Sequence, residues 1–380
     1  MTTATTDADV VIVGAGVMGL SLAWALVKRG RRVTCIDRGS PGREASAATA
    51  GTLAVQNKPI ASIPMTLRSL QMWAALESEL GRSVEYEMRG GIRVAHTPQD
   101  EEKLVRSAAA QAAAGAPVEM LTLAQVFAMA PYLSRDICAA SFCSRDGMGN
   151  PFLAVRALFK ACRTTGVAFL LDQPVTGITV QTDGTIRVQA GGVIAAGATA
   201  VIAAGAWIPA IAAGVGVQLP ITTHIQQVLI TDFGAEKLPH VVTHVRGNLT
   251  LKQQSATGKV LIGGGWSGLG DSASGQRRLS RDSMTGNARA ALATVPGLAS
   301  ARLLRGWTGF EGRTPDKLPV IGRLPGTQNL HVLGCASGGL TLAPAAGDLL
   351  AQHLCGEPVA LSLEPFSPAR FVGSADGGLH

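Results

Sequence analysis

Three glycines stand at a spacing that suits phosphate binding. Gly14, Gly16 and Gly19 directly follow the apolar run VVIV at 10–13, and an acidic residue, Asp37, ends the next apolar segment. A strand that ends in a turn too tight for side chains and then opens a helix brings backbone N–H groups up to a diphosphate. The carboxylate would accept hydrogen bonds from both hydroxyls of an adenosine ribose, and it disfavours a 2′-phosphate. The pattern therefore predicts a site for NAD or FAD.

The elements that position these residues follow from the hydrophobic pattern. Residues 9–37 predict a buried strand, a glycine turn, a helix from Leu20 and a second strand. The C-terminal segment 330–354 repeats this design, with a glycine-rich loop between strand and helix. We expect both units to face one ligand, which makes the nucleotide domain discontinuous. Between them, residues 46–53 predict a loop of small residues and residues 63–80 a long helix.

The composition fits an α/β protein large enough for two domains. The chain has 380 residues, of which 47% are hydrophobic and 16% charged, and its 46 glycines show no repeating period. The formal net charge is +7, but the Lys and Arg residues are dispersed and only 4% of residues are aromatic. Nucleic-acid binding would need a basic stripe interleaved with stacking aromatics, so we expect no nucleic-acid partner. A basic surface that attracts small anionic ligands is consistent with these numbers.

Cysteines and apolar segments indicate a cytoplasmic protein without a metal site. The six cysteines include no CxxC pair and no metal-ligand spacing, which predicts reduced thiols. Residues 188–231 contain no Asp, Glu, Lys or Arg, which on hydropathy alone would suggest a membrane span. Glycines and prolines interrupt this stretch every few residues, however, as in buried strands and turns. The first eleven residues carry no basic segment ahead of the apolar run, so we expect no export signal and no integral membrane segment.

Nearly the whole chain resembles the FAD-dependent amine and amino-acid oxidoreductases of the D-amino-acid oxidase, glycine oxidase and sarcosine oxidase type. The order and spacing of the matching segments make the resemblance specific. These segments are VVIVGAGVMG, ASAATAGTL, RGGIRVA, DGMGNP, VIAAGAWIP, LPITTHIQQ, KVLIGGG, RGWTGFEGRTPDKLPVIG and GCASGGLTLAP. The resemblance implies an α/β fold with a discontinuous, Rossmann-like FAD-binding domain and an α+β substrate domain built on an antiparallel sheet. The implied FAD-binding domain comprises 1–82, 145–216 and 305–375, and the substrate domain 83–144 and 217–304.

The resemblance also implies which residues hold FAD. Ser46 and the backbone of residues 49–51 would carry the second half of the pyrophosphate, and Val175 would contact adenine beside Arg38. The N–H groups that open the last helix would stabilise negative charge at flavin N1 and the C2 oxygen during reduction. The full expected set is Gly14, Gly16, Val17, Met18, Gly19, Asp37, Arg38, Ser46, Thr49, Ala50, Gly51, Leu53, Val175, Ala204, Gly205, Trp207, Gly338, Gly339, Leu340 and Thr341.

Amine oxidation beside a flavin needs little acid or base. A hydride leaves the carbon next to a neutral nitrogen for flavin N5, and water hydrolyses the resulting imine. By resemblance Lys252 lies near flavin N5, where its charge would favour the reaction with oxygen, although an exposed strand lysine is the competing interpretation. Gly309 stands where members with covalent flavin can carry a cysteine, which implies non-covalent FAD. Cys335 is expected to pack near the ring.

The sequence departs from the family pattern at the substrate site. Glu311 stands where glycine and D-amino-acid oxidases carry an arginine for the substrate carboxylate, and Arg313 follows two residues later. Either another cation among Arg313, Lys58 and Lys252 binds an acid, or the substrate offers Glu311 a cationic or hydroxylated group. A structural salt bridge from Glu311 to Arg313 or Arg305 is the third alternative. Lys252, Glu311 and Arg313 are the candidate catalytic residues.

These observations predict oxidation of the C–N bond of a small amine, or of an N-substituted or D-amino acid, with O2 or another electron acceptor. Two alternatives stay open. The chain is a flavoprotein subunit of a larger complex, such as a dehydrogenase of the opine, sarcosine or hydroxyproline type, or it is an NAD-dependent dehydrogenase. The second alternative leaves the C-terminal glycine unit without a role. Homo-oligomers and partner subunits are both compatible with the sequence.

Overall fold

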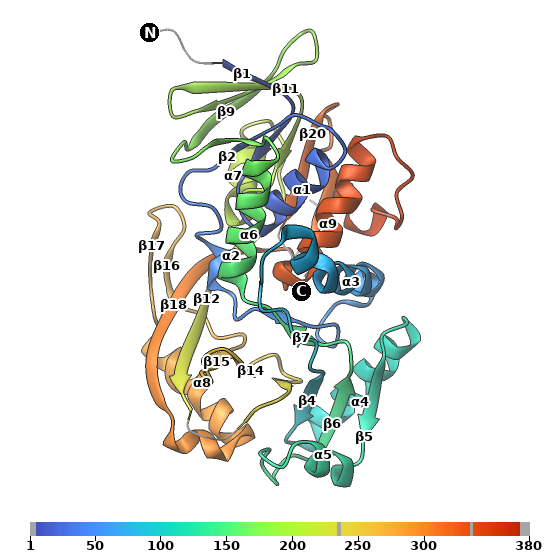
Figure 1. Cartoon of the computed structure of the whole chain (residues 1–380), viewed down its shortest axis with the longest axis vertical. Coiled ribbons are helices and arrows are strands. Elements are labelled where there is room, and N and C mark those ends of the chain that lie inside the picture. The colour runs from blue at the N-terminus through green and yellow to red at the C-terminus, as the bar shows by residue number, and fades with distance from the viewer. Residues whose placement is uncertain (1–4, 234–236, 335–336, 373–380) are drawn as a thin grey trace.

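Two eight-stranded sheets organise the chain. The computed structural model describes residues 5–233, 237–334 and 337–372. One sheet and its helices form the upper part of the molecule in Figure 1, and the other sheet forms the lower part. The helices are α1 (Val17–Val27), α2 (Ala45–Ala48), α3 (Ile63–Leu80), α4 (Pro98–Ala113), α5 (Leu123–Met129), α6 (Pro151–Thr164), α7 (Ile208–Ala213), α8 (Arg281–Thr294) and α9 (Gly339–Leu354).

The first sheet has a parallel centre. Its strand order is β19-β20-β11-β1-β2-β8, with β10 and β9 attached to β11. The bounds are β1 (Thr5–Val13), β2 (Val33–Ile36), β8 (Ala168–Leu170), β9 (Val175–Val180), β10 (Ile186–Ala190), β11 (Val193–Ile202), β19 (Val320–Arg323) and β20 (Leu330–Gly334). The strands β20, β11, β1, β2 and β8 run parallel, whereas β19, β10 and β9 join through antiparallel pairs. This topology brings the N-terminal and C-terminal strand-glycine-helix units into one sheet.

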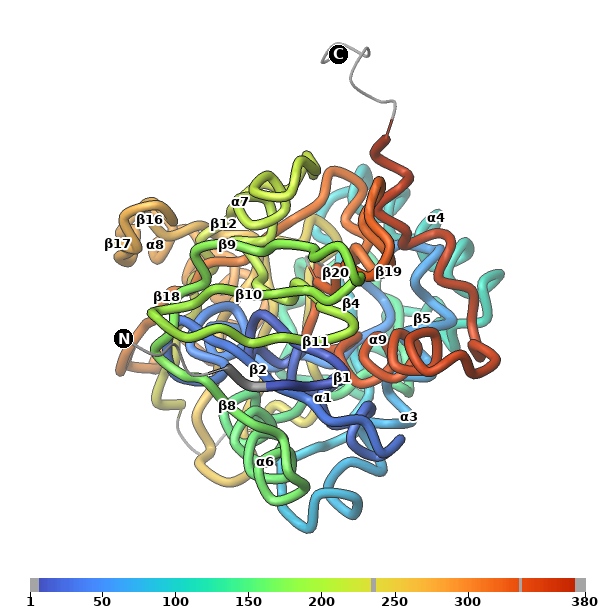
Figure 2. The backbone as a smooth tube through the Cα atoms, turned by 90° about the horizontal axis from the view of Figure 1, so that it is seen from above, coloured from blue at the N-terminus to red at the C-terminus, as the bar shows by residue number. Residues whose placement is uncertain are grey.

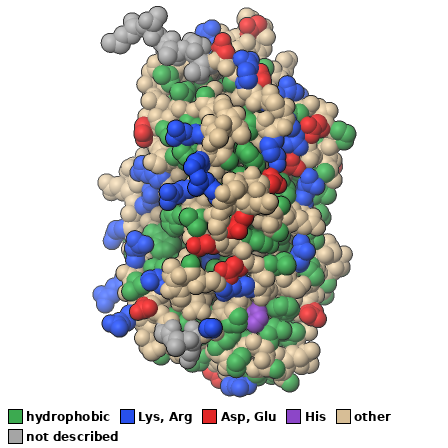
Figure 3. Space-filling model, in the orientation of Figure 1, with side chains coloured by type: hydrophobic (Ala, Val, Ile, Leu, Met, Phe, Trp, Pro, Cys, Tyr) green, Lys and Arg blue, Asp and Glu red, His purple; other side chains and the backbone are tan. Residues whose placement is uncertain are grey.

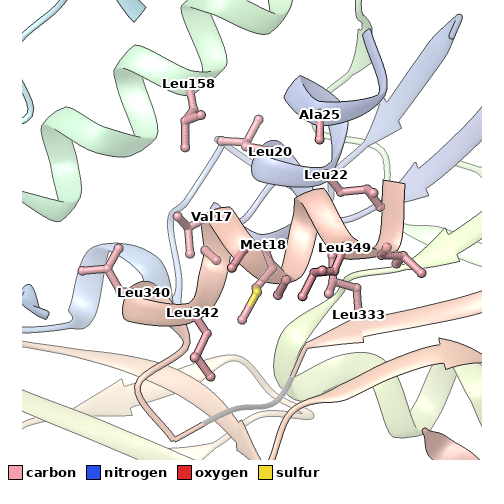
Figure 4. Packing of buried hydrophobic residues seen from close by; sticks show 14 of the residues in the cluster. Val17, Met18, Leu20, Leu22, Ala25, Leu158, Leu333, Leu340, Leu342 and Leu349 are labelled. Atoms are coloured by element: carbon pink, nitrogen blue, oxygen red, sulfur yellow. The ribbon is translucent and has the colours of Figure 1, made fainter. Parts of the chain in front are cut away.

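Alternating side chains of β1 bury both faces of this sheet. Val10 and Ile12 pack into the core that α1, α6 and α9 share, whereas Val11 and Val13 pack against the other face with β10 and α7. Figure 2 shows α7 and β9 on one side of the sheet and α6 and α1 on the other. The leucines of α1 and α9 meet directly in Figure 4. A continuous apolar strand is typical of a parallel sheet covered on both faces.

The second sheet is antiparallel except for one pair. Its order is β18-β12-β15-β14-β13-β4-β6-β5, and only β13 and β4 run parallel. The bounds are β4 (Gly91–Ala95), β5 (Val118–Leu121), β6 (Ala139–Cys143), β12 (Thr222–Asp232), β13 (Val241–His244), β14 (Thr250–Gln253), β15 (Val260–Gly263) and β18 (Arg302–Arg313). Two small two-stranded antiparallel sheets pair β3 (Thr52–Leu53) with β7 (Gly147–Met148), and β16 (Leu269–Asp271) with β17 (Gln276–Arg278).

The two faces of the second sheet have different neighbours. Leu251 and Ile262 pack into a core closed by α5 and α8. On the opposite face Val228 and Leu261 pack against Ala50, which belongs to the segment between α2 and β3. This inner face therefore lies against the part of the chain that was expected to approach the cofactor.

The structure confirms most predicted elements and corrects two details. The helix at 63–80 is confirmed as α3. The first helix begins at Val17 and not at Leu20, and residues 46–53 are not a continuous loop because they contain most of α2 and all of β3. The expected domain boundary at residue 305 falls inside β18, which pairs along its whole length with β12. Residues 188–231 form strands, turns and α7, and no helix among the described residues is long and apolar enough to span a membrane.

Candidate cofactor site

Both glycine units line one cavity. The cavity has a volume of about 470 Å³, and Gly14 and Gly16 of the first unit share its wall with Gly338 and Gly339 of the second. These residues are far apart in sequence, but β1 and β20 flank β11 in the same sheet, so their carboxyl ends open toward the same edge. Glu311 of the second sheet also lines the cavity.

Close backbone packing explains two of the glycines in the first turn. Gly14 has φ +117°, and a side chain there would collide with the Ala203 carbonyl in the turn that follows β11. A side chain at Gly19 would collide with the carbonyl of Gly14. The third glycine, Gly16, lines the cavity, and a Cβ atom added there would lie 3.3 Å from Ser46 Oγ. Two glycines thus shape the turn, and the third keeps the approach to α1 clear.

Asp37 lies beside this turn with both carboxylate oxygens engaged. Oδ2 accepts a hydrogen bond of 2.7 Å from the Ala15 N–H, and Oδ1 accepts one of 2.9 Å from the Gly39 N–H. Burial raises the pKa of Asp37, and these two backbone N–H groups oppose the shift. Asp37 lines the cavity at the end of β2, where each oxygen keeps a further lone pair for a ligand hydroxyl.

Polar groups cluster where α1 meets the cavity. The helix starts after Gly16 without a side-chain cap, and Ser46 Oγ accepts the Val17 N–H at 2.9 Å. The Arg38 guanidinium stacks 3.5 Å from the centre of the Trp207 ring and forms an ion pair of 3.2 Å with Glu44. Figure 3 shows Lys and Arg side chains gathered on the side of the molecule that carries the β16–β17 hairpin and β18. Anionic ligands are attracted to such a surface.

The second glycine unit presents the start of α9. Gly338 precedes the helix in the left-handed region, with φ +77°, and supplies no side-chain cap. The first turn of α9 is tied to its surroundings through Thr341, whose hydroxyl donates to the Thr52 carbonyl at 3.2 Å. The Thr341 carbonyl accepts the Trp73 indole N–H at 3.2 Å. These bonds hold the positive end of the helix dipole toward the cavity.

Most of the expected cofactor residues line this cavity. Those that do are Gly14, Gly16, Val17, Met18, Asp37, Arg38, Ser46, Thr49, Val175, Ala204, Gly205, Trp207, Gly338, Gly339 and Leu340. The remaining five support the wall from behind. They are Gly19 against Gly14, Ala50 against the second sheet, Gly51 beside the Gly149 carbonyl, Leu53 in the core, and Thr341 on Thr52. The predicted neighbour Cys335 lies outside the described residues.

Several lining residues escaped the sequence prediction. Thr52 lines the cavity, and its buried Oγ1 has no hydrogen-bond partner in the described part of the chain. Glu44, Gln226 and Phe310 also line it. Thr52 was detectable, since it alternates with the buried Leu53 on a short strand. Gln226 and Phe310 were not, because their approach depends on the pairing of β12 with β18.

Glu311 forms the salt bridge that was the third alternative. Its carboxylate accepts from Arg313 Nε at 2.5 Å, yet Glu311 still lines the cavity with 8% of its surface exposed. His224 stands directly opposite Glu311 on β12. Burial and the nearby Arg313 guanidinium lower the pKa of His224 to about 4, so this imidazole is neutral at pH 7. Arg313 does not line the cavity.

Lys252 is buried and not exposed, which removes the competing interpretation of its role. Only 1% of its surface is accessible. It follows Leu251 on β14 and therefore points to the inner face of the sheet, where Nζ lies next to Gly51. Burial lowers the pKa of Lys252 well below its ordinary value, and Glu87 partly opposes the shift. The side chain lies behind the cavity wall and is not part of the lining.

The site favours an organic cofactor with a diphosphate. Among the described residues no group of three or more His, Cys, Asp and Glu side chains is arranged to hold a metal ion. The open start of α1 suits phosphates, and the Asp37 carboxylate suits a ribose. The apolar wall at Val175 suits an adenine, and the Thr52 hydroxyl, which has no partner in the described part of the chain, suits a polar ring. These residues fit FAD.

Comparison with known proteins places the chain in a family. Residues 9–353 match the family model described as "FAD dependent oxidoreductase". Glycine oxidase from Geobacillus kaustophilus strain HTA426 is 30% identical over 375 residues, which cover 96% of this chain and 97% of that one. A subunit of opine oxidase from Rhizobium meliloti is 27% identical over 378 residues, covering 96% and 98%. The crystal structure of the Geobacillus kaustophilus glycine oxidase superposes with a TM-score of 0.90 at 28% identity, covering 97% of this chain and 100% of that one.

The matches extend over nearly the full length of these proteins, as the resemblance of the motifs predicted. They confirm the α/β fold with its two sheets. The chain belongs to the family of FAD-dependent oxidoreductases, and it is similar to glycine oxidase in both sequence and structure.

Proposed function

We propose that the chain oxidises the C–N bond of a small amine, or of an N-substituted or D-amino acid. One observation carries the proposal: Glu311 of the second sheet lines the same cavity as the two glycine units. When bound, FAD would supply a hydride acceptor at N5, so that the C–H bond next to nitrogen would break with its electron pair. The nitrogen loses its proton, water adds to the imine carbon, and a carbonyl compound and an amine or ammonia leave.

The residues of the chain contribute orientation and charge. Glu311 offers an acceptor to the amine N–H groups. The Phe310 ring packs against Trp207 at 5.6 Å between ring centres and supports this end of the cavity wall. Arg313 holds the Glu311 carboxylate in place through their ion pair.

We infer that FAD is held without a covalent bond. A side chain at Gly309 would collide with Ala48 Cβ and would lie 3.1 Å from the Glu44 carbonyl, so this position has no room for a cysteine. FAD would then depend on the phosphate site at α1, on Asp37 and on the start of α9.

Lys252 supports the use of oxygen as electron acceptor. Its Nζ lies beside Gly51, in the wall between the two sheets, where burial disfavours the charged form of the lysine but strengthens the field of that form. In its protonated form Lys252 would stabilise the negative charge that oxygen acquires during reduction. The same charge would also serve another anionic acceptor.

The second candidate is a flavoprotein dehydrogenase subunit of a larger complex. The opine oxidase relative is itself named as a subunit, and it aligns with almost the whole chain. The edge strand β18 exposes Leu303 and Leu304 between two arginines, which gives a partner an apolar and basic edge. An NAD-dependent dehydrogenase has less support, since it gives the second glycine unit no role. We further infer a cytoplasmic location from the five described cysteines, all of which are free.

An anaerobic spectral screen tests the proposal. The purified chain is mixed with secondary amines, D-amino acids and opines, and bleaching of the flavin absorbance is followed before air is readmitted. We expect FAD in the purified protein and bleaching by at least one of these substrate classes. Recovery of colour in air identifies an oxidase, and recovery only with an added acceptor identifies a dehydrogenase. A colourless protein that rebinds no FAD contradicts the proposal, as does a flavoprotein that none of these compounds reduces.

A further inference from the structure

Lys58 is a buried lysine placed at the start of α9. Only 6% of its surface is exposed. Its Nζ occupies the space next to Gly338 that a side chain at that residue would fill. Within the described part of the chain, Nζ has no carboxylate oxygen within 4 Å and donates no hydrogen bond. Gly338 itself lines the cofactor cavity, whereas Lys58 stands one layer behind it.

This placement is electrostatically unfavourable unless an anion lies closer to Nζ than Asp146 and Glu311, which act on it only from a distance. An ammonium group at a helix N-terminus meets the positive end of the helix dipole, and burial adds a desolvation cost. Burial lowers the pKa of Lys58 to about 8, although Asp146 and Glu311 oppose the shift. An anion at the Gly338 turn would relieve both costs, since the lysine and the helix would attract it together.

A buried polar network fixes the loop that carries Lys58. Asp146 accepts the Val55 N–H at 2.6 Å, and Gln111 donates to the Gln56 carbonyl at 2.5 Å. Arg93 donates to the same carbonyl at 2.6 Å. Three separate elements thus hold the backbone of this loop, so Nζ is positioned before any ligand binds.

We propose that Lys58 and the first N–H groups of α9 form one anion site, which balances the negative charge on the pyrimidine edge of FAD when FAD is reduced. The inference rests on the proposed function. Substrate carboxylate is the other anion of matching chemistry. The cofactor is favoured because Lys58 lies behind Gly338 and reaches the cavity through its field, not through a direct bond.

The test is the midpoint potential of the bound FAD, measured without substrate in the wild type and in Lys58→Met. We expect the reduction equilibrium to shift at least tenfold toward oxidised FAD, a fall of about 30 mV for a two-electron couple. Lys58→Arg keeps the charge and is expected to keep the potential. Lys160→Met, which removes a lysine of α6 remote from the cavity lining, is the matched control and is expected to change nothing.

The outcomes separate the two levels of proposal. If the wild type binds no FAD, the proposed function fails. If Lys58→Met binds FAD at an unchanged potential, this inference alone is overturned, and weaker substrate binding in that variant would assign Lys58 to a substrate carboxylate. Lys58→Met and Lys58→Gln could both lose FAD. In that case, a Lys58→Arg variant that keeps FAD at the wild-type potential supports the inference that a positive charge is required at this position. Loss of FAD in Lys58→Arg as well overturns the inference.

Discussion

Replacing Gly309 with alanine tests how tightly the second sheet packs against the phosphate-binding segment. The added Cβ would lie well under 3.0 Å from Ala48 Cβ and 3.1 Å from the Glu44 carbonyl. Non-bonded carbon atoms prefer about 3.5–4.0 Å, so α2 or β18 must move. Overpacking of this kind costs about 1–3 kcal/mol. Because α2 carries Ser46, which accepts the Val17 N–H, we expect weaker FAD binding as well.

The assay is urea unfolding of wild type, Gly309→Ala, Ala48→Gly and the double variant, with FAD affinity measured on each. Ala48→Gly removes the opposing methyl group at a cost of about 1 kcal/mol for glycine in a helix. We expect the double variant to lose about 1 kcal/mol less than the two single losses together, since neighbouring sites are not additive. If Gly309→Ala is as stable as the wild type and the double variant is additive, the packing argument is refuted, and with it the steric support for non-covalent FAD.

Three further predictions concern the cofactor, the acceptor and pH. Asp37→Ala removes a carboxylate bonded to two backbone N–H groups, and equilibrium dialysis should show FAD affinity reduced about 10-fold to 100-fold; unchanged affinity would contradict the site. Lys252→Met should slow reoxidation by air roughly tenfold in stopped flow while anaerobic reduction by substrate stays within about twofold; equal loss in both steps would assign Lys252 to substrate binding. Burial lowers the pKa of His224, His244 and His331 to about 4 and raises that of Asp146 to about 6. The unfolded histidines take up protons first as pH falls, and Asp146 offsets one of the three, so the free energy of unfolding should fall by roughly 7 kcal/mol between about pH 6.5 and 4; constant stability there would contradict it.

Local patterns sufficed to predict the elements of the first sheet. The strand before Gly14, α3, α6 and α9 follow from apolar periodicity and from glycines that end or begin them. The apolar pattern places the start of α1 at Leu20 and not at Val17, because glycine at the turn hides the beginning of the helical pattern. The convergence of Gly16 and Gly338 on one cavity follows from the repeated strand-glycine-helix design, which predicts two parallel strands of one sheet, although no local pattern relates two turns separated by most of the chain.

The second sheet and the substrate side were less predictable. The strand β18 begins with Arg302 and contains three glycines, so its composition does not indicate a strand of this length. Its pairing with β12 sets which residues face the cavity, and pairing is a long-range property. The position of Lys58 escaped for the same reason: its neighbours Gln111 and Asp146 come from distant segments.

A crystal structure of the chain purified with FAD is the most direct test of the account. We predict one flavin whose diphosphate lies at residues 14–17 and whose ring edge faces the first turn of α9 at Gly338 and Gly339. A structure in which the nucleotide binds at the first turn while the second glycine unit stays away from its ring would contradict the account.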